Sequence, residues 1–230
     1  MKKLMLALML VVALAVPVFG QATKTQNTEA LAWTSIPNVA DGTGIKASAE
    51  INCSAVYSTT IMIDWCLAEA AAHDGTEIIV MVASEATVND AWTVLTKLKS
   101  FAVTPVATAI DATEEPAQTV LTTATNTTGM DWPGKFVFIE HTTPGSCEIV
   151  YLVEIPDSTS VTCLDATTKD HTAAASKLWG VDTATGSVVN TWAVSIPVSV
   201  SRVKVIFNNW LDTTGANGYG RVRATQLTAL

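Results

Sequence analysis

The stretch Ile61-Met62-Ile63-Asp64-Trp65-Cys66-Leu67-Ala68 decides the fold class. Its largest apolar side chains stand at every second position, from Ile61 to Leu67. Because successive side chains of a β-strand point to opposite faces, this period of two predicts a strand with one face on a core. A short helical turn over 67–72 is the alternative at its end, and His73-Asp74-Gly75 would stop that turn.

Short runs of the same kind recur along the chain. Alternating or continuous apolar runs predict strands over 77–82, 92–98, 136–141, 149–155, 161–164, 192–196, 203–207 and 219–227. Turn signals such as Asp41-Gly42-Thr43-Gly44 and Pro156-Asp157-Ser158-Thr159 separate them. About ten short strands, with no amphipathic helix after the first twenty residues, predict an all-β protein: an antiparallel β-sandwich, or a jelly-roll-like variant of it.

The first twenty residues have the layout of a secretory signal peptide. Lys2 and Lys3 precede the apolar run 4–16, and small residues follow at Gly20 and Ala22. The apolar run is shorter than the roughly 20 residues that cross a bilayer as a helix. We therefore expect cleavage after residue 20 or 22 and no retained membrane span, a retained anchor being the alternative. The leader is bacterial in style and predicts a secreted or cell-surface protein.

The rest of the chain divides into two parts. Residues 23–38 are polar, with Trp33 and Ile36 as their only large apolar side chains, so 21–40 is predicted to be an extended N-terminal arm. The Thr-rich stretch 104–128 could mark a boundary between subdomains. We favour a single β-sandwich domain over 41–230, because the strands on either side of that stretch look incomplete alone.

The composition limits the partners. The chain has 13 basic and 21 acidic residues and a net charge of -8, and loss of the two leader lysines would bring it to about -10. An acidic surface repels nucleic acid and anionic lipid, so neither is expected to bind. Only 15% of the residues are charged, against about 25% in typical soluble domains. Either part of the surface is buried against other subunits, or Thr, Ser and Asn side chains cover it.

The four cysteines are Cys53, Cys66, Cys147 and Cys163. An even count in an exported chain favours disulfides, and four cysteines allow three pairings. The simplest pairing is local, Cys53 with Cys66 and Cys147 with Cys163. Free thiols or a zinc site are the alternatives, but the sequence has no CxxC pair and no Cys/His cluster at ligand spacing.

Acidic and histidine residues form no catalytic signature in the sequence. A GxSxG string is absent, and Glu140 and His141 are neighbours on a predicted strand, so they point to opposite faces. Glu148 and Glu154 share a strand face but are separated by about 20 Å, which is too far for a carboxylate pair. We expect no catalytic residue, no enzyme activity and no cofactor.

Aspartates in predicted loops raise the question of a structural Ca²⁺ ion. They are Asp41, Asp165, Asp170 and Asp212. Exported β proteins use such loops for hard cations, but no DxDxDG string supports the idea. We therefore interpret these residues as turn acids and predict no metal site.

Seven tryptophans are the chain's main candidates for contact with another molecule. Trp65, Trp92 and Trp192 fall on predicted strand faces, which favours the core. Trp132 and Trp210 stand at loop edges, where an indole ring can stack on a sugar or anchor an interface. Trp33 in the predicted arm is the third candidate interface residue, and packing within the chain is the alternative for all three.

One segment carries a family resemblance. It runs from Glu148-Ile149-Val150 through the Pro156 turn to Ser160-Val161-Thr162-Cys163-Leu164-Asp165-Ala166-Thr167-Thr168 and His171. It resembles a segment of phage tail and virion structural proteins of the β-sandwich type, and the ending 202–209 with 219–223 is similar to that of uncharacterised proteins of this sort. The resemblance covers mainly the last third of the chain. It implies a building block that packs against copies of itself, although the leader and the four cysteines depart from a virion protein assembled in the cytoplasm.

These observations predict an exported, non-catalytic structural protein that self-assembles into an extracellular filament, sheath or surface layer. The low charge content and an arm able to donate a strand to a neighbour favour this interpretation. The alternative is a secreted β-sandwich module that binds a carbohydrate or another surface through Trp132 and Trp210. The expected partners are copies of the same chain and, in the alternative, a polysaccharide.

Overall fold

The structure, a computed structural model, describes residues 23–39, 43–71, 75–85, 92–124, 134–181, 186–210 and 217–228. The expected signal peptide, both expected cleavage positions and Trp132 lie outside these residues. Within them the chain forms fifteen β-strands, the single 3-10 turn η1 (Pro144–Ser146) and no α-helix. The predicted all-β class is confirmed.

The strands form three antiparallel sheets, which we call sheets A, B and C. Sheet A has the order β1 (Thr23–Ile36), β15 (Gly218–Thr228), β4 (Ser58–Leu67) and β13 (Val189–Ile196). Sheet B has the order β2 (Ile45–Ala47), β14 (Arg202–Asn208), β5 (Glu77–Ala83) and β6 (Thr93–Lys99), and β3 (Ile51–Asn52) also pairs with β14. Sheet C has the order β7 (Pro105–Ala109), β12 (Ser176–Val181), β9 (Lys135–His141), β10 (Glu148–Asp157), β11 (Ser160–Cys163) and β8 (Val120–Thr122).

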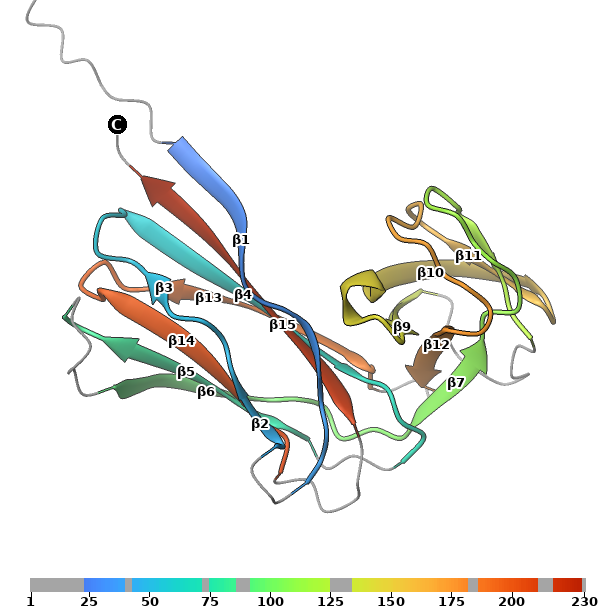
Figure 1. The fold of residues 1–230 in the computed structure, drawn as a ribbon, viewed down its shortest axis with the longest axis horizontal. Coiled ribbons are helices and arrows are strands. Elements are labelled where there is room, and N and C mark those ends of the chain that lie inside the picture. The colour runs from blue at the N-terminus through green and yellow to red at the C-terminus, as the bar shows by residue number, and fades with distance from the viewer. Residues whose placement is uncertain are drawn as a thin grey trace, which may run out of the picture.

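Sheets A and B pack face to face as the predicted β-sandwich, drawn on the left of Figure 1. The period of two in β4 has the expected result, because Ile61, Ile63 and Trp65 are completely buried between the sheets. The Trp65 ring stacks on Phe207 of β14 at 5.7 Å between ring centroids. Burying each such side chain contributes about 1.5–3 kcal/mol, so β4 is the centre of this core.

Sheet C curls on itself as a separate body, drawn on the right of Figure 1. Its two end strands are joined by a bridge between Ile110 and Thr123, and the Ala124 N–H donates to the Ala109 carbonyl at 3.0 Å. The sheet therefore closes into a small barrel, which has its own apolar core. That core contains Ile110, Leu121, Val137, Ile139, Val150, Leu152, Val161, Cys163 and Leu178. The sequence patterns predict neither this closure nor strands β7, β8 and β12.

The barrel and the sandwich meet through aromatic side chains of the outer faces of β9 and sheet A. Phe138 lies 5.2 Å from Trp33 and 5.3 Å from Tyr219, between ring centroids. The Glu140 carboxylate accepts hydrogen bonds from the Tyr219 hydroxyl at 2.9 Å and from Trp179 Nε1 at 2.7 Å. Side chains of the barrel, such as Phe138, therefore pack into the same core as the sandwich. The single domain over 41–230 stays a prediction.

The segment predicted to be an arm forms β1 and pairs with β15 of its own chain. Trp33 is 5% exposed and Ile36 is 1% exposed, so both side chains belong to the core of this chain. This corrects the expectation that Trp33 is an interface residue. The physical reason is that Trp33 fills the angle between the Phe138 ring and the Arg221 guanidinium, which lies 4.4 Å from the Trp33 ring centroid.

The cysteines are four free, buried thiols, which corrects the prediction of two local disulfides. Cys53 bonds to Thr59, and Cys66 stands seven residues further along β4, about 23 Å away at the rise of a strand. Cys163 pairs with Leu152, five residues or about 16 Å along β10 from Cys147. Bridged Cα atoms must lie within about 7 Å, so neither local pair can form without rearrangement.

Candidate functional site

A cleft of about 730 Å³ lies where the outer face of sheet A meets the barrel. Sheet A supplies its floor, the end of β6 and the residues after it supply one wall, and β9 and β10 of the barrel supply the other. The lining residues are Asp64, Lys99, Phe101, Phe136, Ile149, Val189, Asn190, Thr191, Trp192, Arg221 and Arg223. This volume is within the range of about 300–1,000 Å³ that ligand sites occupy.

The floor of the cleft is a buried ionic network centred on Asp64, which is 1% exposed. Its Oδ2 atom accepts from Arg221 Nη2 at 2.7 Å and Nε at 2.9 Å, and from Arg223 Nη2 at 3.0 Å. Its Oδ1 atom accepts from the Thr191 hydroxyl at 3.0 Å. One carboxylate thus faces two guanidinium groups, and the network keeps one net positive charge.

Strand register brings these residues together. Asp64 stands on the face of β4 opposite to Ile63 and Trp65, and it pairs directly with Arg221 on one side and Thr191 on the other. Arg223 follows two residues after Arg221, so it shares the same face. The signal in the sequence was an ionised residue inside an apolar strand, with two arginines at a period of two in a later strand. Sequence analysis did not connect these two patterns.

Exposed aromatic rings border this floor. The Phe101 and Phe136 side chains are 57% and 55% exposed, and both line the cleft. The Phe136 ring meets the Tyr151 ring edge-on, at 5.0 Å between centroids. Trp192, predicted to be a core residue, is only half-buried and also lines the cleft. The cleft therefore combines cations with apolar ring surfaces.

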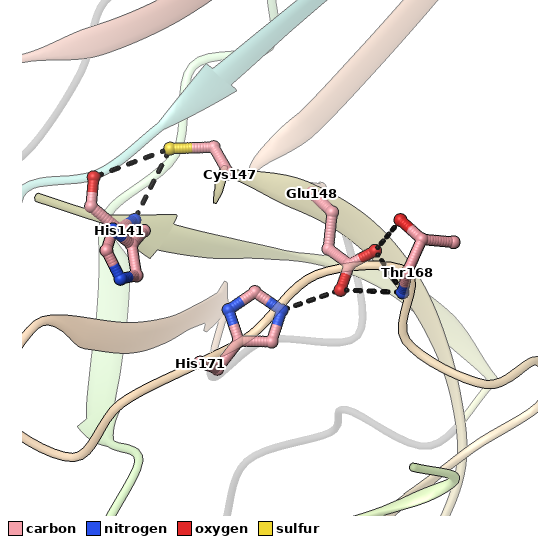
Figure 2. A network of polar contacts seen from close by, with 5 residues as sticks. All are labelled: His141, Cys147, Glu148, Thr168 and His171. Carbon is pink, nitrogen blue, oxygen red and sulfur yellow. Dashed lines mark hydrogen bonds and ion pairs between the residues drawn. The ribbon is translucent and has the colours of Figure 1, made fainter. Parts of the chain in front are cut away.

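A second polar cluster lies at one end of the barrel, around Glu148 and His171 (Figure 2). The Glu148 carboxylate bonds to His171 Nε2 at 2.6 Å and accepts from the Thr168 hydroxyl at 2.9 Å. The His171 backbone is bridged in both directions to that of Glu114. The Glu114 side chain is buried and accepts from the Thr122 N–H at 2.8 Å. No sequence pattern predicts this cluster.

The buried position of the Glu148–His171 pair indicates a structural role. His171 is completely buried, and its Nδ1 atom has no hydrogen-bond partner among the described residues. A general base must reach the proton that it abstracts, and this imidazole is closed off from any substrate. Glu148 shares the inward face of β10 with Val150 and Leu152, so the pair closes the end of the barrel core.

The cysteine thiols are also structural. Cys147 Sγ accepts from the His141 N–H at 3.3 Å and donates to the His141 carbonyl at 3.6 Å, and this pair of bonds closes the β9–β10 turn (Figure 2). Burial raises the pKa of Cys147 to about 11. Burial, with a smaller contribution from Glu148, raises the pKa of Cys163 to about 12. Such thiols stay protonated at neutral pH and are poor nucleophiles and poor metal ligands.

The hydrogen bonds of the Glu148 carboxylate predict a loss of stability in acid. Burial would raise the pKa of Glu148, but the hydrogen bonds from His171 and Thr168 outweigh it and hold the pKa below its ordinary value. A depressed pKa stabilises the fold above the ordinary value of about 4.3 and ceases to do so as the pH falls through the folded-state pKa. Urea unfolding between about pH 7 and pH 3 should therefore show a smaller acid loss in Glu148→Gln than in the wild type.

Glu154→Gln is the matched control for that experiment, because Glu154 lies exposed on the same strand. It should follow the wild-type curve. Equal pH dependence of all three proteins would show that the Glu148 contacts do not carry the effect.

The other sequence candidates do not gather at one site. Trp210 is 43% exposed after β14 and does not line the cleft. Trp92, predicted to be a core residue, is half-buried. Its ring centroid lies 4.0 Å from Lys204 Nζ and 5.0 Å from the Arg202 guanidinium.

Within the described ranges no three His, Cys, Asp or Glu side chains form a metal-binding group, and no helix could cross a membrane.

Comparison with known proteins identifies no family for this chain. No protein-family model matches it, and no curated protein matches it. A chain in the structure of infectious bursal disease virus, Gx strain, is similar, with 11% identity, a TM-score of 0.20, and coverage of 92% of this chain and 83% of that chain. VP17, a capsid protein of bacteriophage P23-77, is 10% identical with a TM-score of 0.16, and the match covers 88% of this chain and 99% of VP17. Likeness at these TM-scores carries no argument about function.

Proposed function

We propose that this chain is an exported, non-catalytic building block that self-assembles into an extracellular filament, sheath or surface layer. Assembly occurs by pairing of an edge strand of one copy with an edge strand of the next. The observation that carries the proposal is the outer edge of β13. No described strand pairs with that edge. β13 has eight residues, none of them charged, and it pairs with β4 along its whole length without a register shift. A regular edge of this kind is a template for another strand.

Among the described residues, the edges of sheets B and C are protected, unlike that of β13. The barrel joins its end strands, and closure removes edges. In sheet B, β6 carries Lys97 and Lys99, while β2 and β3 at the other side have only three and two residues. Lysines and short strands are the devices that keep sheet edges apart.

The first strand of sheet A offers the complementary edge. β1 is the other end strand of the sheet, and near its middle the Ala30 carbonyl accepts from the Ala49 N–H at 2.9 Å. Its first residues remain open, and the Lys24, Thr25, Thr28 and Glu29 side chains are exposed. β1 therefore presents its N-terminal half as the open edge.

The strand count allows the two edges to join. Neighbouring strands of sheet A alternate in direction, so β1 and β13, at the two ends of a four-stranded sheet, run in opposite directions. A second copy added in the same orientation would set its β1 antiparallel to β13. Strand register sets four residues side by side across sheet A, one on each strand: Thr28, Ala224, Ile61 and Val194. The β1 strand of a second copy can therefore pair with β13 with little shift along the strand direction. A head-to-tail contact of this kind does not close a dimer and generates a filament.

Lysines on the β13 edge should abolish assembly. The Ala193 and Ser195 side chains are exposed, so Ala193→Lys/Ser195→Lys adds two charges without touching the core. We expect filaments of the wild type in electron micrographs and only monomers of the variant in sedimentation velocity, because lysines on an edge strand oppose the addition of another strand.

The matched control is Val153→Lys/Leu164→Lys, which adds the same charge at exposed positions of the barrel. It should assemble like the wild type. A wild type that stays monomeric at high concentration, or an edge variant that assembles equally well, would contradict the proposal.

Export rests on the predicted leader alone. N-terminal sequencing of protein from the culture medium tests it, and we expect the mature chain to begin at residue 21 or 23.

A further inference from the structure

The cleft concentrates positive charge on an acidic protein. Among the described residues, the cations Lys99, Arg221 and Arg223 line it against the one carboxylate of Asp64, which gives two net positive charges. The whole chain has a net charge of -8. Asp64 is already saturated by its bonds to the arginines and Thr191. The Lys99 side chain is exposed at the rim. The cleft therefore suits an anionic group that approaches from solvent.

The same cleft presents apolar rings to solvent. Phe101 on one wall and Phe136 on the other are each more than half exposed, and Tyr151 holds the Phe136 ring edge-on. Large apolar side chains that converge on one hollow mark a binding surface. Phenylalanine faces pack well on the C–H faces of sugar rings, while guanidinium groups bind carboxylates in a bidentate manner.

We propose that this cleft binds a short segment of an acidic polysaccharide, with sugar carboxylates at Arg223 and Lys99 and sugar rings against Phe101 and Phe136. The proposal does not rest on self-assembly through β13, although residues 189–192 of that strand line the cleft. A glycan fits better than a nucleic acid, because duplex DNA carries one charge per about 1.7 Å and a chain of net charge -8 repels it. A uronic acid polymer has only one charge for each sugar and offers apolar ring faces between the charges.

Titration with tetragalacturonic acid at low ionic strength tests the proposal, and Trp192 in the cleft gives the fluorescence signal. The wild type should bind, and the neutral cellotetraose should bind about tenfold more weakly or not at all. Lys99→Glu should weaken tetragalacturonate binding about tenfold. Lys97→Glu is its matched control, because this substitution makes the same change of charge on the same strand but outside the cleft. The Lys97 side chain pairs with Glu77 at 3.1 Å. Lys97→Glu should retain the wild-type affinity.

A second pair of variants tests the rings. Phe101→Ala should also weaken binding, whereas Tyr57→Ala, which removes a 64% exposed ring outside the cleft, should not. Absence of tetragalacturonate binding, or equal affinities of Lys99→Glu and Lys97→Glu, would overturn the proposal. Tighter, Lys99-dependent binding of oligo(dT) or of a glutamate peptide would also overturn it, because the ligand would then belong to another class. Circular dichroism of each variant confirms that the sheet is intact.

Discussion

Replacement of Asp64 by alanine is expected to lower the free energy of unfolding by about 3–5 kcal/mol, the usual cost of removing one partner from a buried ion pair. Asp64 is 1% exposed and is the only carboxylate among the described residues that line the cleft, where Arg221 and Arg223 both donate to it. Without it, two guanidinium groups repel each other on one face of sheet A. Urea denaturation followed by tryptophan fluorescence measures the loss, and the slope of the transition should remain unchanged.

Two further variants show whether the cost arises from uncompensated charge. Adding Arg221→Gln to Asp64→Ala should recover part of the loss, because one of the two unpaired cations is then gone. The exposed Lys97–Glu77 pair is the control, and Glu77→Ala should cost no more than about 1 kcal/mol. If Asp64→Ala cost as little as Glu77→Ala, the network would not hold the floor of the cleft.

Gly218→Ala is expected to destabilise the sandwich by about 3 kcal/mol, at the upper end of the usual range for overpacking. Gly218 begins β15, and a Cβ atom there would overlap the six-membered ring of Trp65. Trp65 is completely buried and stacked on Phe207, so its ring has no space into which it can move. Thermal and urea unfolding would both measure the loss.

The outcome can be assigned to this contact. Trp65→Leu alone leaves a cavity, but in the Gly218→Ala background it should restore part of the stability, because the shorter side chain makes room for the methyl group. Gly145→Ala is the matched control, since nothing lies within 4 Å of a Cβ atom at that position. It should change stability by less than about 0.5 kcal/mol. Additive effects of Gly218→Ala and Trp65→Leu would rule out the overlap as the cause.

Sequence reasoning found the strands whose apolar residues alternate. The expected runs at 61–67, 77–82, 136–141 and 203–207 each fall within an observed strand. The missed strands β7, β8 and β12 are short, and Thr, Ala, Ser and Gly weaken their pattern. Without a strong period there is no local signal to separate such strands from loops.

The disulfide prediction failed for a related reason. Nearness in sequence was used as a substitute for nearness in space, and an extended strand separates residues quickly, by about 3.3 Å each. Cys53 contacts Thr59 at the start of β4 while Cys66 lies at its end, and Cys147 and Cys163 belong to different cores. The pairing of cysteines depends on the arrangement of whole strands, which the spacing of four residues does not contain.

The amino-acid sequence by itself determined the all-β class, the sandwich and the inward faces of its main strands, because the alternation of side chains along a strand is a local property of the backbone. Only the tertiary structure decided that sheet C closes into a barrel, that Glu148 meets His171, and that Asp64 meets both arginines. Each of these contacts joins residues at least thirteen positions apart, through strand order and register. Register is set by the packing of all strands together, so no single segment can specify it.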